Sequence, residues 1–207
     1  MQDLKNKPLK ILVVEDTEIH QIAARKLLEG HDVTVVDAFD YALDVLGVNV
    51  GNQGIGKTYY KRRDIDVVLT DLFYTQGRGD MLKPECKDNL KVEQMPYGFP
   101  LALIAARRGI PTAVITDTNH HNHPMAYTFD YFVADDGNPH KFNIDGTSVV
   151  MTSNMPGVYL TKNGDLKNRE ELSEDQRFEK DENGERVYKY AKNWKAVLDE
   201  LIGEVGK

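Results

Sequence analysis

The stretch DVVLTDLF, at residues 66–73, decides the fold of this chain. Apolar residues follow one another through it without alternation, and the run leads directly into Asp71. A strand that is apolar at successive positions is buried on both faces, which is typical of the parallel sheets of α/β proteins. We therefore predict a buried strand from Ile65 to Thr70. Asp71 would then lie at the edge where the carboxyl ends of parallel strands open onto a crevice.

Strands and amphipathic helices alternate along the rest of the chain. Further strands are predicted over residues 9–14, 32–36, 112–116 and 131–134. Helices are predicted over residues 17–29, 40–46 and 99–108, and a final helix carries Trp194, Val197, Leu198, Leu201 and Ile202 on one stripe. Such alternation is typical of a parallel sheet with helices packed on its faces. We predict a flavodoxin-like, doubly wound α/β fold with a parallel five-stranded sheet in the order 2-1-3-4-5.

A single domain over residues 1–207 accommodates these elements, with insertions at about residues 47–63, 74–97 and 137–190. In the third insertion, Asn163-Gly164 and Asn183-Gly184 each lie within a stretch that favours a β-hairpin before the C-terminal helix. The same segment is dense in charges of both signs, which is typical of a solvated surface.

The composition excludes several classes of partner. The formal net charge is −7 and Lys and Arg form no basic stripe, so we expect no nucleic-acid binding. Cys86 is the only cysteine, which excludes an intrachain disulfide and favours a reducing compartment. The polar start MQDLKNKP is unlike a signal peptide, and no apolar run approaches the roughly 20 residues of a membrane span. We therefore expect a cytoplasmic protein with no membrane association.

Polar residues follow four of the five predicted strands, at one edge of the sheet. They are Glu15 and Asp16, Asp71, Thr116 and Asp117, and Asp135 and Asp136. Carboxylates that lie close together repel one another and need a cation or a proton to coexist. A hard divalent cation is the natural partner of such oxygen ligands. A single strand-end acid is commonly the N-cap of the next helix, but acids after several strands favour a metal site.

Three segments together resemble the receiver domain of bacterial response regulators: KILVVEDTE (10–18), DVVLTDLF (66–73) and PTAVITD (111–117). The resemblance implies that Asp71 is the phosphorylated aspartate. It also implies that Mg²⁺ is held by Glu15, Asp16, Asp71 and the carbonyl of Phe73, and that Thr116 contacts the phosphoryl group. An aspartyl carboxylate attacks a phosphoryl donor only when the repulsion between the anions is neutralised, and bound Mg²⁺ supplies that neutralisation.

The resemblance also implies a role in signalling rather than enzymatic turnover. A histidine kinase or phosphotransfer protein would supply the phosphoryl group, and a downstream protein partner would recognise the phosphorylated state. Tyr131 or Phe132 on the last predicted strand would repack when Thr116 turns toward the phosphoryl group.

One departure from the family concerns a lysine. Receivers carry a lysine after the fifth strand that pairs with the phosphoryl group, whereas Ala134 or Asp135 occupies that position in the predicted register. Lys141 is the nearest candidate in the sequence. A degenerate receiver that acts as a constitutive binding module is therefore an alternative.

A histidine-rich segment follows the fourth predicted strand. Asp117, His120, His121 and His123 offer carboxylate and imidazole ligands to Zn²⁺ or another transition metal. A polar loop that caps the next helix is the simpler interpretation. A third alternative is that a protonated histidine replaces the missing lysine.

Parts of the sequence also resemble two other classes of protein. Residues 51–58, GNQGIGKT, match the P-loop pattern, but a helix rather than a strand is predicted before them, so we interpret them as a glycine-rich connection. The main rival is a Mg²⁺-dependent phosphatase of the haloacid-dehalogenase type, which the order of Asp16-Thr17-Glu18, Thr116 and Asp135-Asp136 resembles. Asp16 would then be the nucleophile, although Glu18 departs from that family's first motif and Asp71 would have no role.

Overall fold

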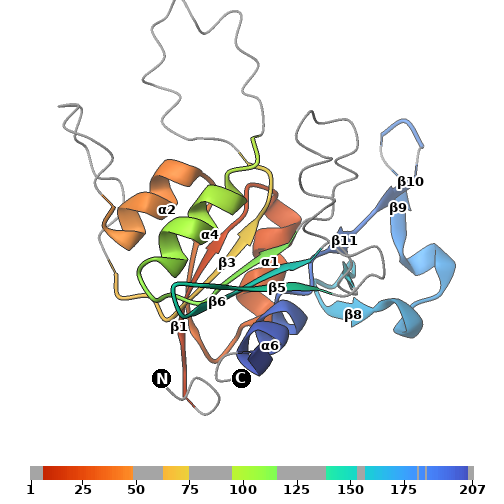
Figure 1. Cartoon of the computed structure of the whole chain (residues 1–207). Helices are drawn as coiled ribbons and strands as arrows, with labels where there is room; N and C mark the ends of the chain where they lie inside the picture. Colours follow the sequence, from red (N-terminus) through yellow and green to blue (C-terminus); the bar gives the residue numbers. More distant parts are fainter. Residues whose placement is uncertain are drawn as a thin grey trace, which may run out of the picture.

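The computed structural model describes residues 7–48, 63–74, 95–115, 139–152, 157–180, 182–184 and 186–204. These residues form a central sheet with helices on both faces and a second group of short strands beside it (Figure 1). We refer to the described residues between 157 and 191 as the arm.

The central sheet has six strands in the order β2-β1-β3-β4-β6-β5. Their bounds are Lys10–Val14 (β1), Asp32–Val36 (β2), Val67–Asp71 (β3), Thr112–Ile115 (β4), His140–Ile144 (β5) and Thr147–Thr152 (β6). The first five in this order pair in parallel, and β5 pairs antiparallel with β6 at the edge. This confirms the predicted flavodoxin-like fold and its parallel strand order, with β6 as the fifth parallel strand and β5 as an added edge strand.

The position of the fifth parallel strand corrects the sequence prediction. The predicted strand 131–134 lies outside the described residues, and the place beside β4 is occupied by β6, with Ile115 opposite Thr152. The β5–β6 hairpin therefore belongs to the central sheet, although its residues were assigned to the third insertion. Val149, Val150 and Met151 in the middle of β6 are apolar and buried, as is typical of a strand that is covered on both faces.

Among the described residues, four helices flank the sheet: α1 (Glu18–Leu27), α2 (Phe39–Leu46), α4 (Gly98–Ala106) and α6 (Trp194–Glu204). Helices α1 and α6 pack on one face, where Ala24, Trp194 and Leu198 meet the alternate β1 residues Ile11 and Val13. Helices α2 and α4 pack on the other face, where Leu12 and Val14 of β1 point. Within the described parts of the chain, no helix has the length and apolar character needed to cross a bilayer.

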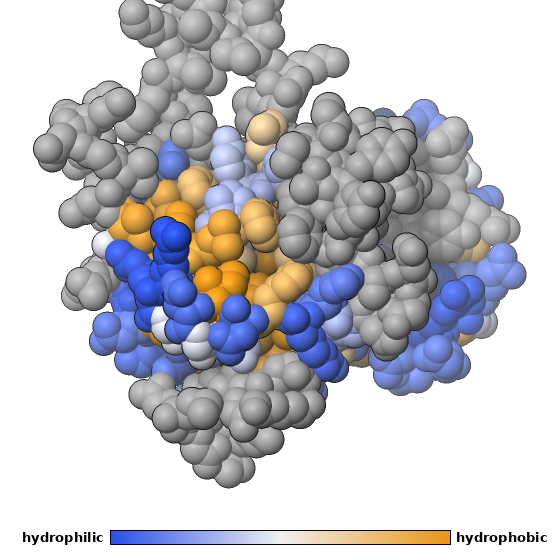
Figure 2. Space-filling view, viewed as in Figure 1, coloured by the Kyte–Doolittle hydropathy of each residue, from blue (hydrophilic) through white to orange (hydrophobic). Residues whose placement is uncertain are grey.

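Helix α4, with the sequence GFPLALIAA, is apolar at every position. Leu101 and Ala105 are buried against the sheet, whereas Phe99, Leu103 and Ile104 are half-buried. Figure 2 shows the resulting hydrophobic area over α2 and α4, bordered by hydrophilic side chains.

The arm consists of short strands and two 3₁₀ turns. Its elements are β7 (Val158–Leu160), β8 (Leu166–Asn168), η3 (Arg169–Glu171), η4 (Glu174–Gln176), β9 (Phe178–Lys180), β10 (Arg186–Tyr188) and β11 (Tyr190–Ala191). Both predicted hairpins are confirmed, because β7 pairs antiparallel with β8 and β9 with β10. Gly164 and Gly184 have φ of +83° and +80° in their turns, a conformation that favours glycine.

The arm packs against helix α1. Strand β11 pairs with β7, and the buried residues Ala191 and Val158 from these two strands join the core that α1 and α6 share. Lys26 near the end of α1 donates a hydrogen bond to the carbonyl of Gly164 at the tip of the β7–β8 hairpin. The arm is therefore joined to the central domain at the strand that leads into α6.

Candidate functional site

Three carboxylates meet at the carboxyl edge of the central sheet. β1 continues directly into Glu15 and Asp16, and Asp71 is the last residue of β3. Because β1 and β3 are parallel neighbours, with Val14 opposite Thr70, these side chains emerge at one edge. An oxygen from each of the three lies within 4.8 Å of the others.

Backbone hydrogen bonds hold two of these carboxylates. Oε1 of Glu15 accepts a hydrogen bond from the Thr17 N–H at 3.0 Å, and Oδ1 of Asp71 accepts one from the Leu72 N–H at 2.6 Å. Glu15 is fully buried and Asp71 is 5% exposed, whereas Asp16 is half-buried. The site therefore has two buried acids that are held by hydrogen bonds, and one acid that is more accessible to solvent.

A buried lysine joins the two buried acids. Nζ of Lys192 lies 2.6 Å from Oε2 of Glu15 and 2.8 Å from Oδ2 of Asp71. The Lys192 side chain is 1% exposed, and its Nζ is 5.7 Å from the centroid of the Trp194 ring. A buried ammonium group is tolerated only where carboxylates and hydrogen bonds replace its water shell, and Glu15 and Asp71 provide them.

Lys192 was missed in the sequence, and the candidate Lys141 was wrong. Lys141 lies on the edge strand β5, where its Nζ pairs with Glu200 of α6 at 2.6 Å. Lys192 lies between β11 and α6, so the arm separates it in sequence from the fifth parallel strand. A lysine directly before the final amphipathic helix, in KNWKAVL (192–198), was the signal that could have identified it.

The floor of the site below Asp71 contains two buried hydroxyl groups. The Thr70 hydroxyl lies 2.8 Å from the carbonyl of Asp71 and 3.3 Å from the hydroxyl of Tyr74. Burial raises the pKa of Tyr74 above its usual range, and the charge of Asp71 raises it further. The side chain of Phe73 packs in the core with Leu72, and the proposed metal contact of its carbonyl stays a prediction.

Helix α4 begins directly against the end of β3. The Gly98 N–H donates a hydrogen bond to the carbonyl of Leu72 at 3.0 Å. A Cβ at residue 98 would lie 2.1 Å from the carbonyl oxygen of Asp71, far inside van der Waals contact. Gly98 thus permits a close approach of α4 to the backbone that carries Asp71.

The acid cluster can hold a metal ion. Its donors are carboxylate oxygens, the ligands that hard divalent cations prefer. When Glu15, Asp16 and Asp71 are ionised, the Lys192 ammonium neutralises one of their three charges. The two negative charges that remain match a divalent cation.

Several residues predicted for the site lie outside the described residues. They are Thr116 and the histidine-rich segment with Asp117, His120, His121 and His123, together with the switch candidates Tyr131 and Phe132. The glycine-rich residues 51–58 also lie outside. Their predicted roles stay predictions.

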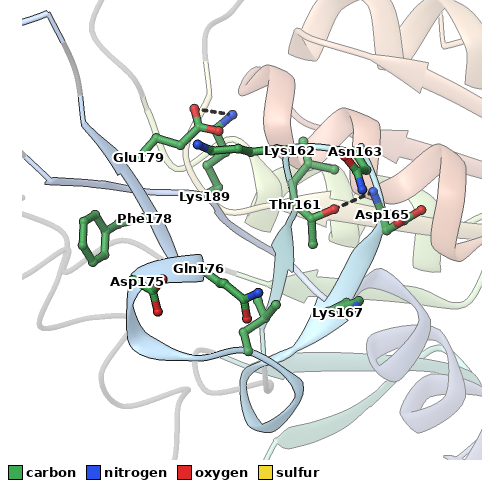
Figure 3. A pocket seen from close by; sticks show the side chains of 12 residues that line it. Thr161, Lys162, Asn163, Asp165, Lys167, Asp175, Gln176, Phe178, Glu179 and Lys189 are labelled. Carbon is green, nitrogen blue, oxygen red and sulfur yellow. Dashed lines mark hydrogen bonds and ion pairs between the residues drawn. The ribbon is translucent and has the colours of Figure 1, made fainter.

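A cavity of about 350 Å³ lies in the arm, away from the acid cluster. Figure 3 shows lysine side chains around it, among them Lys162 and Lys167, interleaved with acidic side chains such as Asp175. Lys189 and Glu179 also line the cavity and pair with each other at 2.8 Å. These lining charges offset one another, which is typical of a solvated surface.

No family model matches the sequence, and no curated protein matches it. Among solved structures, the chain is similar to the Mn(2+)-bound form of response regulator Rcp1. The sequence identity is 18% and the TM-score 0.34, with 58% of this chain and 74% of that chain covered. The sheet order of the present chain is compatible with a flavodoxin-like fold.

Proposed function

We propose that this chain is a receiver-like signalling domain in which Asp71 accepts a phosphoryl group. The observation that carries the proposal is the contact of one buried ammonium, Lys192, with both Glu15 and Asp71, beside the half-buried Asp16. A buried charge cluster that converges on a single aspartate at a sheet edge is typical of a reactive site rather than of a solvated surface.

The chemistry follows from the two oxygens of Asp71. Oδ1 accepts the Leu72 N–H and Oδ2 contacts Lys192, so the carboxylate is fixed in orientation. An oxygen of Asp71 would attack the phosphorus of a donor. The new P–O bond forms as the bond to the leaving group breaks, and the leaving group departs with the electron pair. Lys192 would then pair with the anionic phosphoryl oxygens.

Mg²⁺ is the proposed metal, held by Glu15, Asp16, Asp71 and the carbonyl of Phe73. Bound there, it would neutralise the repulsion between the acids and an incoming phosphoryl group. The contacts of Lys192 and the charge that remains on the cluster support a divalent cation.

The proposed partners are a histidine kinase or phosphotransfer protein as donor and a downstream protein that recognises phosphorylated Asp71. We place the chain in the cytoplasm, where a single cysteine, Cys86, would remain reduced. No turnover of substrate is required for this role.

The degenerate receiver is the second candidate, and one observation favours it. Lys192 itself neutralises part of the charge of Glu15 and Asp71, so the fold can tolerate the acids with the protein's own cation. In that case the arrangement would be a structural ion network, and the chain would bind its partner constitutively.

Thermal unfolding with Mg²⁺ alone and with Mg²⁺ plus beryllofluoride, a mimic of the aspartyl phosphoryl group, tests the proposal. A ligand at about 100 times its Kd stabilises the folded state by about 2.7 kcal/mol. For a chain of this length, that raises the Tm by roughly 5–10 °C. We expect wild type to respond to both additions, and Asp71→Asn to lose the beryllofluoride response.

Two controls complete the experiment. Asp199→Asn removes an acid that is 61% exposed on α6, and it should respond as wild type does. After incubation with a small acyl phosphate donor, mass spectrometry should locate the phosphoryl group on Asp71. Modification of Asp16 instead would favour the phosphatase, and a wild type that responds to neither addition would favour the degenerate receiver.

A further inference from the structure

The segment Lys192–Trp194 connects the arm to α6 and carries the buried ammonium of the site. Residues of regular secondary structure are positioned by repeated backbone pairing, but Lys192 and Asn193 lie between β11 and α6. The position of the Lys192 side chain therefore depends on individual contacts of this short segment.

A single residue of α1, His20, contacts both ends of the segment. Its Nδ1 accepts a hydrogen bond from the Lys192 N–H at 3.3 Å. Its backbone carbonyl accepts one from Nε1–H of Trp194 at 2.9 Å. His20 is 5% exposed, so both bonds lie in the protein interior.

The location of His20 connects the two sides of the site. It lies in the first turn of α1, and the start of this helix is held to the acid pair by the hydrogen bond from the Thr17 N–H to Oε1 of Glu15. Through His20, the same helix turn fixes the backbone from which Lys192 reaches Glu15 and Asp71. The distance between the ammonium and Asp71 is thereby tied to the position of α1.

Asn193 and Trp194 support the other end of the segment. Oδ1 of Asn193 accepts the Ala196 N–H at 3.1 Å, as an N-cap residue does. Trp194 is fully buried in the core shared by α1 and α6. The start of α6 is therefore also held by contacts that do not involve the His20 imidazole, whereas the Lys192 N–H has the His20 imidazole as its acceptor.

We propose that His20 is a positioning residue for Lys192. Nδ1 of His20 accepts the Lys192 N–H and thereby keeps the Lys192 ammonium aligned between Glu15 and Asp71. The role of that alignment in pairing with a phosphoryl group rests on the proposed function. The alignment itself is a property of the folded chain and can be measured without phosphorylation.

Two polar substitutions distinguish the effect of the hydrogen-bond acceptor at Nδ1 from the effect of the size of the side chain. In His20→Asn, Oδ1 can occupy the place of the histidine Nδ1. In His20→Gln, the amide lies one carbon further along, nearer the place of Nε2. If Nδ1 is the important atom, Asn preserves the hydrogen bond to the Lys192 N–H and Gln loses it.

The first readout is the rate at which an amine-acetylating reagent modifies Lys192, followed by mass spectrometry. Lys195, which is 60% exposed, is an internal reference in the same protein. Loss of one hydrogen bond of ordinary strength corresponds to about a five- to tenfold change in an equilibrium. We expect the Lys192 rate, relative to Lys195, to rise by about that factor in His20→Gln and to stay within about twofold of wild type in His20→Asn.

The second readout is the response to Mg²⁺ and beryllofluoride. His20→Gln should weaken the beryllofluoride affinity by about five- to tenfold, with the Mg²⁺ affinity nearly unchanged because the acid ligands are intact. A general loss of packing would lower the Tm and both responses together, so the split between the two ligands identifies positioning.

Equal acetylation of Lys192 in wild type, His20→Asn and His20→Gln would overturn the inference. An equal increase in both variants would also overturn it, because the effect would then not depend on an acceptor at the Nδ1 position. A wild type without a beryllofluoride response would refute the proposed function, while the acetylation comparison would still decide the role of His20. If His20→Gln fails to fold, His20→Leu, which also removes the acceptor at the Nδ1 position, should raise the Lys192 rate in its place.

Discussion

The two halves of the site differ in how the fold positions them. The acid half, Glu15, Asp16 and Asp71, comes from the ends of two adjacent parallel strands whose register is fixed by backbone pairing. The cation half is Lys192, which is 177 residues away from Glu15 in sequence. It is held by side-chain contacts and by the last strand of the arm.

This difference has a structural consequence. A sheet resists displacement of one residue because neighbouring residues share its hydrogen bonds, so the acid half should be insensitive to changes in the arm. A short connecting segment has few contacts, and each is separately important for its position. We therefore expect changes in the arm to alter the cation half while the acids keep their geometry.

The largest effect is expected from removal of the cation in Lys192→Met. Glu15 and Asp71 would be left buried without their ammonium partner, which typically costs about 3–5 kcal/mol. Urea unfolding should show this loss. Added Mg²⁺ should restore more stability to the variant than to wild type, because a metal ion would supply the missing positive charge.

Lys195→Met is the matched control. Lys195 pairs with Asp199 at 3.0 Å, a distance similar to those of Lys192, but both side chains are at least 60% exposed. An exposed pair of this kind contributes about 0.3–0.5 kcal/mol. Equal effects of the two substitutions would contradict the distinction between a buried cation that contacts two acids and an exposed surface pair.

The second prediction concerns the backbone under the acid half. In Gly98→Ala, the added Cβ would meet the carbonyl oxygen of Asp71, a backbone atom that cannot turn away. We expect a destabilisation of about 3 kcal/mol, at the upper end of the range for overpacking. Mg²⁺ affinity measured by calorimetry should also fall, because β3 would shift at Asp71.

Gly203→Ala tests whether that effect is steric. Gly203 lies in α6, and outside the backbone of its own helix turns and its chain neighbours no atom lies within 4 Å of the added Cβ. Alanine should stabilise the helix there by up to about 1 kcal/mol. If Gly98→Ala unfolds at the same urea concentration as wild type, α4 does not hold β3 in the way that the geometry indicates.

The comparison also explains what the sequence could predict. Residues 66–73 and 10–18 carry both the buried strand and the acids that follow it, so local pattern was sufficient to place Asp71 beside Glu15 and Asp16. The fifth parallel strand was placed at 131–134 because that short run resembles a strand. The choice of β6 depends on pairing with β4, a tertiary contact that local pattern does not contain.

The cation was missed for a related reason. The expectation that the lysine directly follows the fifth strand led to Lys141. Nothing in the local sequence shows that the chain forms the strands of the arm between β6 and α6 before it returns to the central sheet. Lys192 becomes adjacent to Asp71 only when β11 pairs with β7 beside α1. The arm increases the distance in sequence between β6 and Lys192, but Lys192 still lies beside Asp71 in space.

The third prediction tests whether the arm positions the cation half. A Cβ at residue 157 would lie 1.9 Å from the ring of Tyr190, which is two residues before Lys192. Because a ring can shift more readily than backbone, Gly157→Ala should cost about 1 kcal/mol, at the lower end for overpacking. Its beryllofluoride response should weaken while the Mg²⁺ response stays close to that of wild type.

The opposite result would be informative about the arm. A variant Gly157→Ala in which the acetylation rate of Lys192 is unchanged would show that His20 and α6 hold the segment without help from β11. A variant that loses the Mg²⁺ response as well would show that the arm also supports the acid half, contrary to the expected independence of the two halves.

The smallest effect at neutral pH is expected from Tyr74→Phe, below the acid half. The Thr70 hydroxyl retains the carbonyl of Asp71 as acceptor, so loss of the Tyr74 hydroxyl should cost no more than about 1 kcal/mol. The difference should change sign at high pH. Burial raises the pKa of Tyr74 above its ordinary value of 10.0, so the folded state keeps the phenol proton that the unfolded chain releases.

Wild type should therefore lose stability relative to Tyr74→Phe by about 1 kcal/mol for each pH unit above 10. The other tyrosines are common to both proteins, so their ionisation cancels in the difference. Urea unfolding at pH 7, 10 and 11 measures it. A constant difference over that range would mean that Tyr74 ionises as readily in the folded protein as in the unfolded chain, which is incompatible with a buried phenol close to the charge of Asp71.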